Sequence, residues 1–144
     1  MDRRRWVSLA VLALLLPLAA CGGSTDPDHL EGTWKLTEFG EDEGVKGSAE
    51  ITVSLRDGRL GGNGGVSDLR GGYTSDDEGG LTFEEVATNL KPGPAELMDQ
   101  EGRLVETLKK VASFEVDGAG GDDPAELELK NAAGDVILSL VEKS

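Results

Sequence analysis

The sequence predicts an α+β domain in which a curved antiparallel sheet of about eight strands, a half-open barrel, packs around one amphipathic helix. Segments of alternating apolar and polar residues recur between residues 30 and 86 and again from 114 to 141. A single stretch with helical periodicity separates the two groups, so strands and helices do not alternate along the chain. Because parallel strands need crossover connections, an antiparallel sheet curling around the helix is the economical way to bury both apolar surfaces.

The first twenty residues are predicted to be a signal peptide, in which three arginines precede an apolar run that is too short for a stable membrane anchor. Leu18-Ala19-Ala20-Cys21 resembles a bacterial lipobox, whose small residues fit a peptidase cleft and whose cysteine is acylated. We therefore expect cleavage between Ala20 and Cys21 and a lipid anchor on Cys21, the only cysteine of the chain. The residues around Arg4 also resemble a twin-arginine signal, but the very apolar run favours the ordinary secretory route.

The segment after Cys21 is predicted to be a flexible tether. Residues 22–29 hold no large apolar side chain, and the folded domain is expected to span residues 30–144. A diacylated or triacylated cysteine holds a membrane durably, because each buried methylene contributes about 0.8 kcal/mol. The expected location is the extracytoplasmic face of a cell membrane, and acylation would leave the mature chain without a thiol.

The strands expected before the helix are marked by alternation and by turn residues. Asp57-Gly58 is a strong hairpin signal, because such a turn requires positive φ angles. The alternation slips in phase just before Val86, which indicates a β-bulge. The expected strands cover residues 30–39, 49–55, 59–62, 72–75 and 81–86.

The helix is predicted to begin at Pro94 and to run for about 18 residues. Leu97, Glu101, Leu104, Leu108 and Val111 fall at helical spacing, and a proline is well tolerated in a first helical turn. Two lysines near the other end suit the helix dipole. Three strands follow, at residues 114–116, 127–129 and 136–141, and the last is apolar at both phases and is expected to be central and covered on both sides.

The charge balance limits the partners of the domain. The whole chain carries −14, and removal of residues 1–20, which carry +2, leaves a mature chain near −16. Nucleic acid is an unsuitable partner, since binding it requires a basic face. Anionic headgroups will repel the domain, so the lipid must hold it at the membrane. We expect a monomer, with an envelope protein as its partner.

Residues 61–73, GGNGGVSDLRGGY, invite a phosphate-binding interpretation. A dinucleotide fingerprint that starts at Gly62 would place Ser67 at its third glycine, and no helical period follows it. The lysine of a P-loop is also missing. The stretch is instead predicted to form a tight corner between two strands, where glycines allow the backbone to bend and to pass close to other chain segments.

The same stretch resembles the signature of META-domain proteins, the family of the heat-shock-inducible HslJ lipoproteins. The resemblance covers most of residues 30–141 and rests on order and spacing rather than on one specific motif. It implies the fold described above and an association with stress or envelope functions. The matching residues are Trp34, Gly62, Gly65, Val66, Ser67, Gly71, Tyr73 and Thr88.

The chain departs from the family pattern at two positions. Val66-Ser67 stands where the family has Cys-Asn, and Pro92 stands where the family has a second cysteine. From this paired loss we infer that the two positions lie close together in the fold and that packing alone holds the corner.

The sequence predicts no catalytic residue, metal or cofactor. His29, the only histidine, falls in the predicted tether, and a serine nucleophile therefore has no positioned base in the sequence pattern. The acidic clusters lie in glycine-flanked turns and lack the spacing of a calcium loop. Arg70 is the basic group selected for a test of ligand contact. The acidic clusters are residues 41–43, 76–78 and 122–123.

The expected function is that of a lipid-anchored, non-catalytic accessory or protein-interaction module. The alternative is a small-molecule or lipid binder that uses a gap between the sheet and the helix. Four large apolar side chains would line this gap, although such residues more often form an ordinary core. They are Trp34, Phe83, Leu104 and Phe114.

Overall fold

The computed structural model describes residues 23–144. The predicted signal peptide, the Ala20–Cys21 cleavage site and the lipidation of Cys21 fall outside the described residues. Two helices and nine strands follow one another in this part of the chain. They are α1 (Pro27–Leu30), β1 (Gly32–Phe39), β2 (Glu43–Gly44), β3 (Thr52–Arg56), β4 (Arg59–Asn63), β5 (Leu69–Ser75), β6 (Leu81–Thr88), α2 (Ala95–Leu108), β7 (Ser113–Asp117), β8 (Glu126–Lys130) and β9 (Val136–Glu142).

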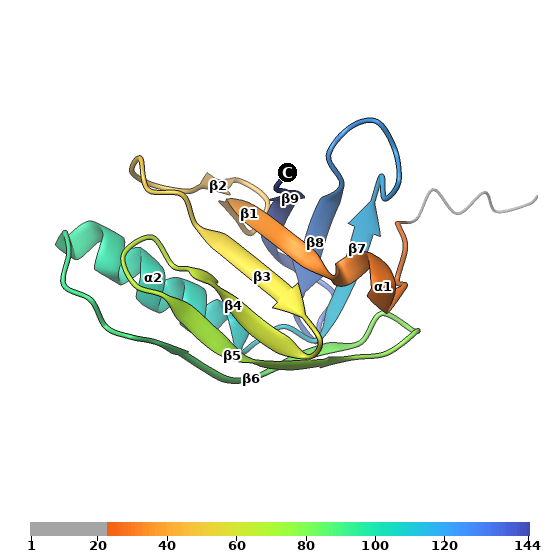
Figure 1. Ribbon diagram of the computed structural model, residues 1–144, viewed down its shortest axis with the longest axis horizontal. Coiled ribbons are helices and arrows are strands. Elements are labelled where there is room, and N and C mark those ends of the chain that lie inside the picture. The colour runs from red at the N-terminus through yellow and green to blue at the C-terminus, as the bar shows by residue number, and fades with distance from the viewer. Residues whose placement is uncertain (1–22) are drawn as a thin grey trace, which may run out of the picture.

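The strands form one antiparallel sheet that curves into a half-barrel. Its order is β6-β5-β4-β3-β1-β9-β8-β7, and the short β2 pairs with β1 beside this path. The two outer strands meet at one end, where the Leu81 N–H donates to the Ala112 carbonyl and the Phe114 N–H donates to the Gly79 carbonyl. At the other end α2 lies against the sheet (Figure 1). The predicted fold class is confirmed.

One continuous core fills the inside of the half-barrel. Alternate residues of β1, β3, β8 and β9 point into it, as the two-residue period of a strand requires. Leu104 and Leu108 add the apolar face of α2. Trp34 is buried in this core, and its indole N–H donates a 2.8 Å hydrogen bond to the Leu30 carbonyl. No buried side-chain polar atom of the described residues lacks a hydrogen-bond partner.

Helix α2 is shorter than predicted, because it ends at Leu108 and not near residue 112. After Leu108 the chain tightens into a turn in which the Val111 N–H donates to the Leu108 carbonyl. The Ala112 N–H then donates to the Lys130 carbonyl. Val111 remains buried, as its helical spacing predicted, but it belongs to the turn. The first residue of the helix is Ala95, one position after the predicted proline.

The segment predicted to be a flexible tether is instead held against the domain from Ser24 onward. Ser24 forms an antiparallel bridge with Val116 on β7, with backbone hydrogen bonds in both directions. The Asp26 side chain then caps α1 by accepting from the Asp28 N–H, and Leu30 at the end of α1 is fully buried. The tether was predicted because residues 22–29 hold no large apolar side chain. Ser24 is nevertheless held against the domain, because it pairs with β7 through backbone hydrogen bonds, which require no apolar side chain.

Strand β9 lies in the middle of the sheet, as predicted, between β1 and β8. The expectation that both of its faces are covered is wrong. Leu138 and Leu140 are buried inside the half-barrel, whereas Ser139 and Val141 on the outer face are only partly buried; Ile137 is partly buried and packs against the core. The apolar side chain of Val141 therefore lies on a face of the sheet that neither helix of the described residues covers.

Candidate functional site

The glycine-rich stretch forms the corner between β4 and β5, as the sequence predicts. The Gly64 N–H donates to the Ser67 carbonyl at 2.9 Å, and the Gly65 N–H donates to the Asn63 side chain at 2.8 Å. Gly62 has a φ of +124°, and a methyl group there would lie 2.1 Å from the Thr52 carbonyl oxygen. The glycines thus allow β4 to bend while it stays close to β3.

Glu101 joins this corner to α2. Its carboxylate accepts hydrogen bonds from the backbone N–H groups of Val66, at 3.1 Å, and Ser67, at 2.6 Å. The side chain occupies an inward position of the helix and is buried, and Gly64 lies so close that a methyl group there would be 2.7 Å from Glu101 Cγ. In the sequence, Glu101 falls at an apolar position of the helical pattern and matches the META-domain pattern, but no contact of its carboxylate was predicted. A carboxylate at an otherwise apolar position was the signal that could have identified it.

The segment after β6 is fixed to the other side of the same corner. The Asp68 N–H donates to the Asn89 side-chain oxygen at 2.8 Å, and the Lys91 N–H donates to the buried hydroxyl of Ser67 at 2.9 Å. The Lys91 ammonium lies 2.9 Å from the Asp68 carboxylate, and this hydrogen bond together with the lysine's charge lowers the pKa of Asp68. The residues on both sides of Leu90 are therefore anchored.

Leu90, between these anchored residues, is held in an unusual conformation. Its φ of +50° lies in the left-handed region, which costs a residue with a side chain about 1–2 kcal/mol. Its side chain is 84% exposed, the highest value among the large apolar residues described as exposed. Backbone strain of this kind persists only where the surroundings enforce it, and it gathers at functional sites. The fold thus enforces a conformation that presents leucine to solvent.

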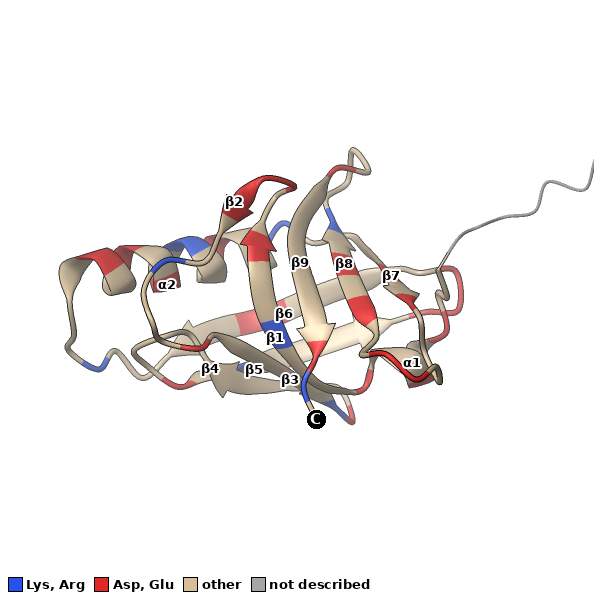
Figure 2. Ribbon diagram, turned by 90° about the horizontal axis from the view of Figure 1, so that it is seen from above, with Lys and Arg blue, Asp and Glu red and all other residues tan. Residues whose placement is uncertain are grey.

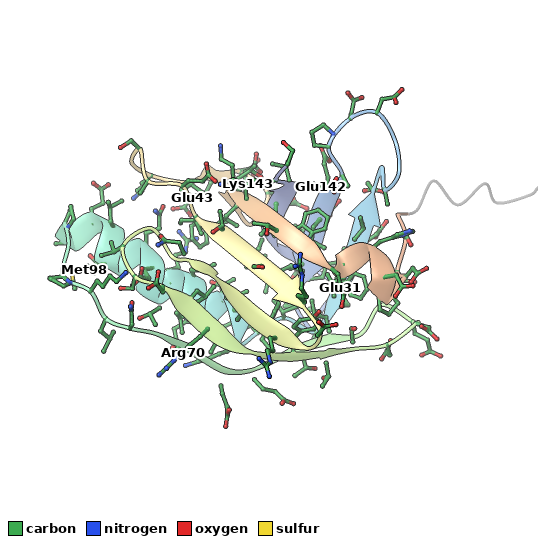
Figure 3. All side chains as sticks on the ribbon, in the orientation of Figure 1. Glu31, Glu43, Arg70, Met98, Glu142 and Lys143 are labelled. Carbon is green, nitrogen blue, oxygen red and sulfur yellow. The ribbon has the colours of Figure 1, made fainter. Side chains whose placement is uncertain are left out.

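An apolar groove, here called the Leu90 groove, lies between Leu90 and α2. Its volume is about 350 Å³, and Met98 at one end is 46% exposed. Its charged lining residues are the exposed Lys91 and Glu106 and the buried Glu101. Figure 3 shows Met98 near the beginning of α2, at the end of the molecule away from Glu31. The remaining lining comes from Ala87, Thr88, Gly102 and Val105.

A second cleft of about 350 Å³ lies on the opposite side of α2, next to the loop after β2. Its polar groups are already paired. The Gln100 amide accepts from the Lys46 N–H and donates to the Lys46 carbonyl, and Arg103 forms a 2.7 Å ion pair with Glu43. The Arg103 guanidinium also lies 4.6 Å from the centre of the Phe39 ring. These contacts attach α2 to the sheet, so we interpret the second cleft as structural.

The residues selected from the family pattern lie in four places. Gly62, Gly65, Val66 and Ser67 form the corner. Gly71 and Tyr73 follow on β5, where the Tyr73 ring lies 6.3 Å from that of Phe83. Thr88 lines the Leu90 groove, and Trp34 lies in the core.

The predicted proximity of the two positions that carry cysteines elsewhere in the family is supported. A methyl group on Gly93, next to Pro92, would lie 2.7 Å from Val66 Cγ1. The hydrogen bond from the Lys91 N–H to Ser67 joins the same two segments. The expectation that packing alone holds the corner is wrong, because hydrogen bonds to the Ser67 hydroxyl and to the Glu101 carboxylate hold it as well.

The four side chains expected to line an internal gap are buried in the core, with exposed fractions between 0% and 6%, and they line none of the clefts described here. They therefore act as core residues. Arg70 is exposed on β5 and makes none of the ion pairs found among residues 23–144 (Figure 3). Arg70 pairs with Ala87 across β5 and β6, so it lies next to a residue of the Leu90 groove without lining the groove itself.

His29 has a neighbour that the sequence analysis did not foresee. Its Nδ1 lies 2.9 Å from the Ser24 hydroxyl, but both groups are in an exposed turn and the same hydroxyl also accepts from the Asp26 N–H. This contact is a local feature of the turn that leads into α1. Within residues 23–144, no three histidine, cysteine or acidic side chains are grouped closely enough to hold a metal ion. None of the described helices has the length and apolar character needed to cross a membrane.

Comparison with known proteins agrees with the architecture. The family model described as META domain matches residues 28–144. The chain belongs to the META domain family. No curated protein matches the chain. An NMR structure of a protein from Burkholderia xenovorans superimposes with a TM-score of 0.69 at 18% identity, covering 90% of this chain and 94% of that protein, which shows a shared fold.

Proposed function

We propose that this META-domain protein is a lipoprotein, anchored through Cys21 on the extracytoplasmic face of a membrane, that serves as a non-catalytic interaction module in envelope maintenance or stress. The proposal for the anchor is supported by the N-terminal pattern of arginines, apolar run and Leu18-Ala19-Ala20-Cys21. The association with envelope and stress functions comes from the resemblance to HslJ lipoproteins.

The observation that carries the proposed interaction role is the enforced exposure of Leu90. A contiguous exposed apolar patch marks an interaction site more strongly than a single exposed leucine, and Leu90 and Met98 are both exposed and line the same groove. Here the residues on both sides of Leu90 are bonded to the corner, so the exposure is built into the fold. The Leu90 groove is therefore the surface that we assign to a protein partner.

The anchor is tested by growing cells with radioactive palmitate and comparing the natural protein with a Cys21→Ser variant. We expect label on the natural protein, and its recovery in the membrane fraction, with neither for the variant. Absence of label from the natural protein would remove the anchor from the proposal.

The interaction role is tested by placing a photoreactive amino acid at position 90 in intact cells. A matched control carries it at Glu126, an exposed position on β8. We expect a discrete adduct from position 90 and none from position 126. Equal labelling from both positions, or no adduct from position 90, would contradict an interaction through the Leu90 groove.

A further inference from the structure

Gly102 is a residue of α2 that the packing of the domain does not explain. Glycine within a helix is unfavourable relative to alanine, because it loses more backbone freedom on folding. A methyl group at Gly102 would meet no atom within 4 Å, so nothing inside the domain requires the glycine. The residue lines the Leu90 groove. The absence of a side chain at Gly102 leaves room for another molecule to approach the backbone of α2 closely.

The form of the occupant follows from the two walls of the groove. One wall is the end of β6, and an extended peptide could in principle add to that strand as a new edge. The edge is protected against such pairing: Glu85 has a φ of +51°, the register of β5 and β6 shifts beside it, and both Glu84 and Glu85 are exposed. The other wall is the helix face around Gly102, which suits the close packing of a second helix.

The charge of the occupant follows from the acidity of the domain. Residues 23–144 contain 11 Lys and Arg against 27 Asp and Glu, a net charge of −16. Acidic residues occur along α2 (Figure 2), and Glu106, which lines the groove, is paired with Lys109. Lys91, which also lines the groove, is already paired with Asp68. A segment with Lys or Arg flanking its apolar face would complement this surface, whereas an acidic segment would be repelled.

The groove also lies at the far end of the molecule from the first described residues. Figures 1 and 2 show α1 and the beginning of the described chain at one end of the long axis and the start of α2, which carries Met98, at the other. With the lipid anchor proposed at Cys21, the groove would face away from the bilayer. This orientation, together with the negative charge, favours a protein segment over a lipid surface as the occupant.

From these four observations we infer that the Leu90 groove binds a short cationic amphipathic helix of another protein, whose apolar face covers Leu90 and Met98 and whose backbone crosses α2 at Gly102. The inference rests on the proposed interaction function and names the chemistry of its partner. In this arrangement Leu90 is the main apolar contact of the bound helix, and Gly102 is the point where the bound helix and α2 come closest.

The test uses the full-length acylated protein in nanodiscs of zwitterionic lipid and three fluorescent peptides. One peptide places Leu and Lys at helical period, the second replaces every Lys by Glu, and the third alternates Leu and Lys as a strand. Fluorescence anisotropy against empty nanodiscs separates binding to the protein from binding to lipid. We expect the helical Leu/Lys peptide to bind at least about tenfold more tightly than the other two, a difference of about 1.4 kcal/mol.

Two groove variants separate binding from folding. Leu90→Gly removes both the apolar side chain and the strained conformation, so its melting temperature should be unchanged or higher while peptide affinity falls at least about tenfold. Gly102→Leu places a large side chain in the groove, in a helix that tolerates leucine better than glycine. The Gly102→Leu protein should have the same or a higher melting temperature, and its affinity for the helical Leu/Lys peptide should fall by a similar factor. Glu96→Leu adds the same side chain to α2 outside the groove and should leave affinity within about threefold.

Equal binding of the three peptides, or full affinity in the Gly102→Leu protein, would overturn the inference. The two parts of the proposed function are tested by other experiments: absence of palmitate label would remove the anchor, and absence of an adduct at position 90 would remove the interaction role. If the adduct forms and no peptide binds, the partner is not a cationic helix and the interaction role stands. If the peptide binds in the groove but no label is found, only the anchor is lost.

Discussion

The carboxylate of Glu101 lies 2.6 Å from the backbone nitrogen of Ser67, and this hydrogen bond joins α2 to the corner between β4 and β5. Ser67 is itself buried, and its hydroxyl accepts from the Lys91 N–H. Helix α2 and the segment that carries Leu90, which form the two walls of the Leu90 groove, are therefore both bonded to the corner at one residue pair. Glu101 fixes the helix, Ser67 fixes the segment that carries Leu90, and the corner lies between them.

The first prediction concerns Glu101. Replacing it with alanine removes the side-chain acceptor and leaves the N–H groups of Val66 and Ser67 without their partner. Because an unsatisfied buried donor and a lost charge-assisted hydrogen bond each cost a few kcal/mol, we expect a loss of about 2–4 kcal/mol in the free energy of unfolding. Glu101→Gln keeps one acceptor oxygen and should lose less. Urea unfolding of the full-length protein in a mild detergent measures both.

Glu106→Ala is the matched control, since Glu106 lies on the same helix and makes only an exposed contact with Lys109. It should change the unfolding free energy by no more than about 0.5 kcal/mol. Equal stability losses at Glu101 and Glu106 would mean that the corner does not depend on the carboxylate.

The second prediction compares two neighbouring glycines of β4. Gly62→Ala must place a methyl group 2.1 Å from a backbone carbonyl at a φ of +124°, so we expect a loss of at least about 2 kcal/mol. Gly61→Ala meets its nearest atom, Ser54 Cβ, at 3.9 Å, and it should be neutral or slightly stabilising. Thermal unfolding of the two variants decides this, and a tolerated Gly62→Ala would contradict the close approach of β4 to β3.

Much of this architecture could be predicted because it depends on local patterns. The two-residue alternation marked the strands, Asp57-Gly58 marked the hairpin, and the phase slip before Val86 marked a bulge that the structure places at Glu85. The corner at residues 61–73 was identified by excluding phosphate motifs and by its glycines. Each of these signals reflects steric preferences of a few consecutive residues.

The groove could not be predicted in the same way, since it depends on contacts between distant residues. Leu90 is exposed because Asn89 and Lys91 bond to Asp68 and Ser67, more than twenty positions earlier in the chain. No local pattern distinguishes that leucine from a core residue. The end of α2 was missed for a similar reason, because Ala112 leaves the helical pattern to hydrogen-bond the distant Lys130 carbonyl.

The third prediction concerns pH. The Lys130 ammonium lies 2.9 Å from the Glu115 carboxylate, and its hydrogen bond, followed by one from the Gly23 N–H, lowers the pKa of Glu115. A lowered carboxyl pKa in the folded state contributes stability above the unfolded-state pKa, and this contribution is lost as the pH falls through the folded-state value. The natural protein should therefore exceed Glu115→Gln in stability at pH 7, and the difference should shrink as the pH drops below about 5.

Melting temperatures of the two proteins between pH 7 and pH 3 measure this difference. Glu50→Gln provides a control at an exposed carboxylate that pairs with Lys143, and it should show a smaller difference at pH 7. A difference between the natural protein and Glu115→Gln that stays constant down to pH 3 would show that the effect of the substitution is not ionic.

The fourth prediction tests whether the chain before β1 is part of the fold. Leu30 at the end of α1 is fully buried, and its carbonyl accepts the Trp34 indole hydrogen bond. Leu30→Ala should therefore cost about 2–5 kcal/mol, as other buried leucine truncations do. Asp28→Ala, in the same helix but exposed, should change stability by no more than about 0.5 kcal/mol. Urea unfolding distinguishes the two cases: the expected loss would show that α1 is part of the folded domain, whereas a neutral Leu30→Ala would contradict the packing of α1 into the core.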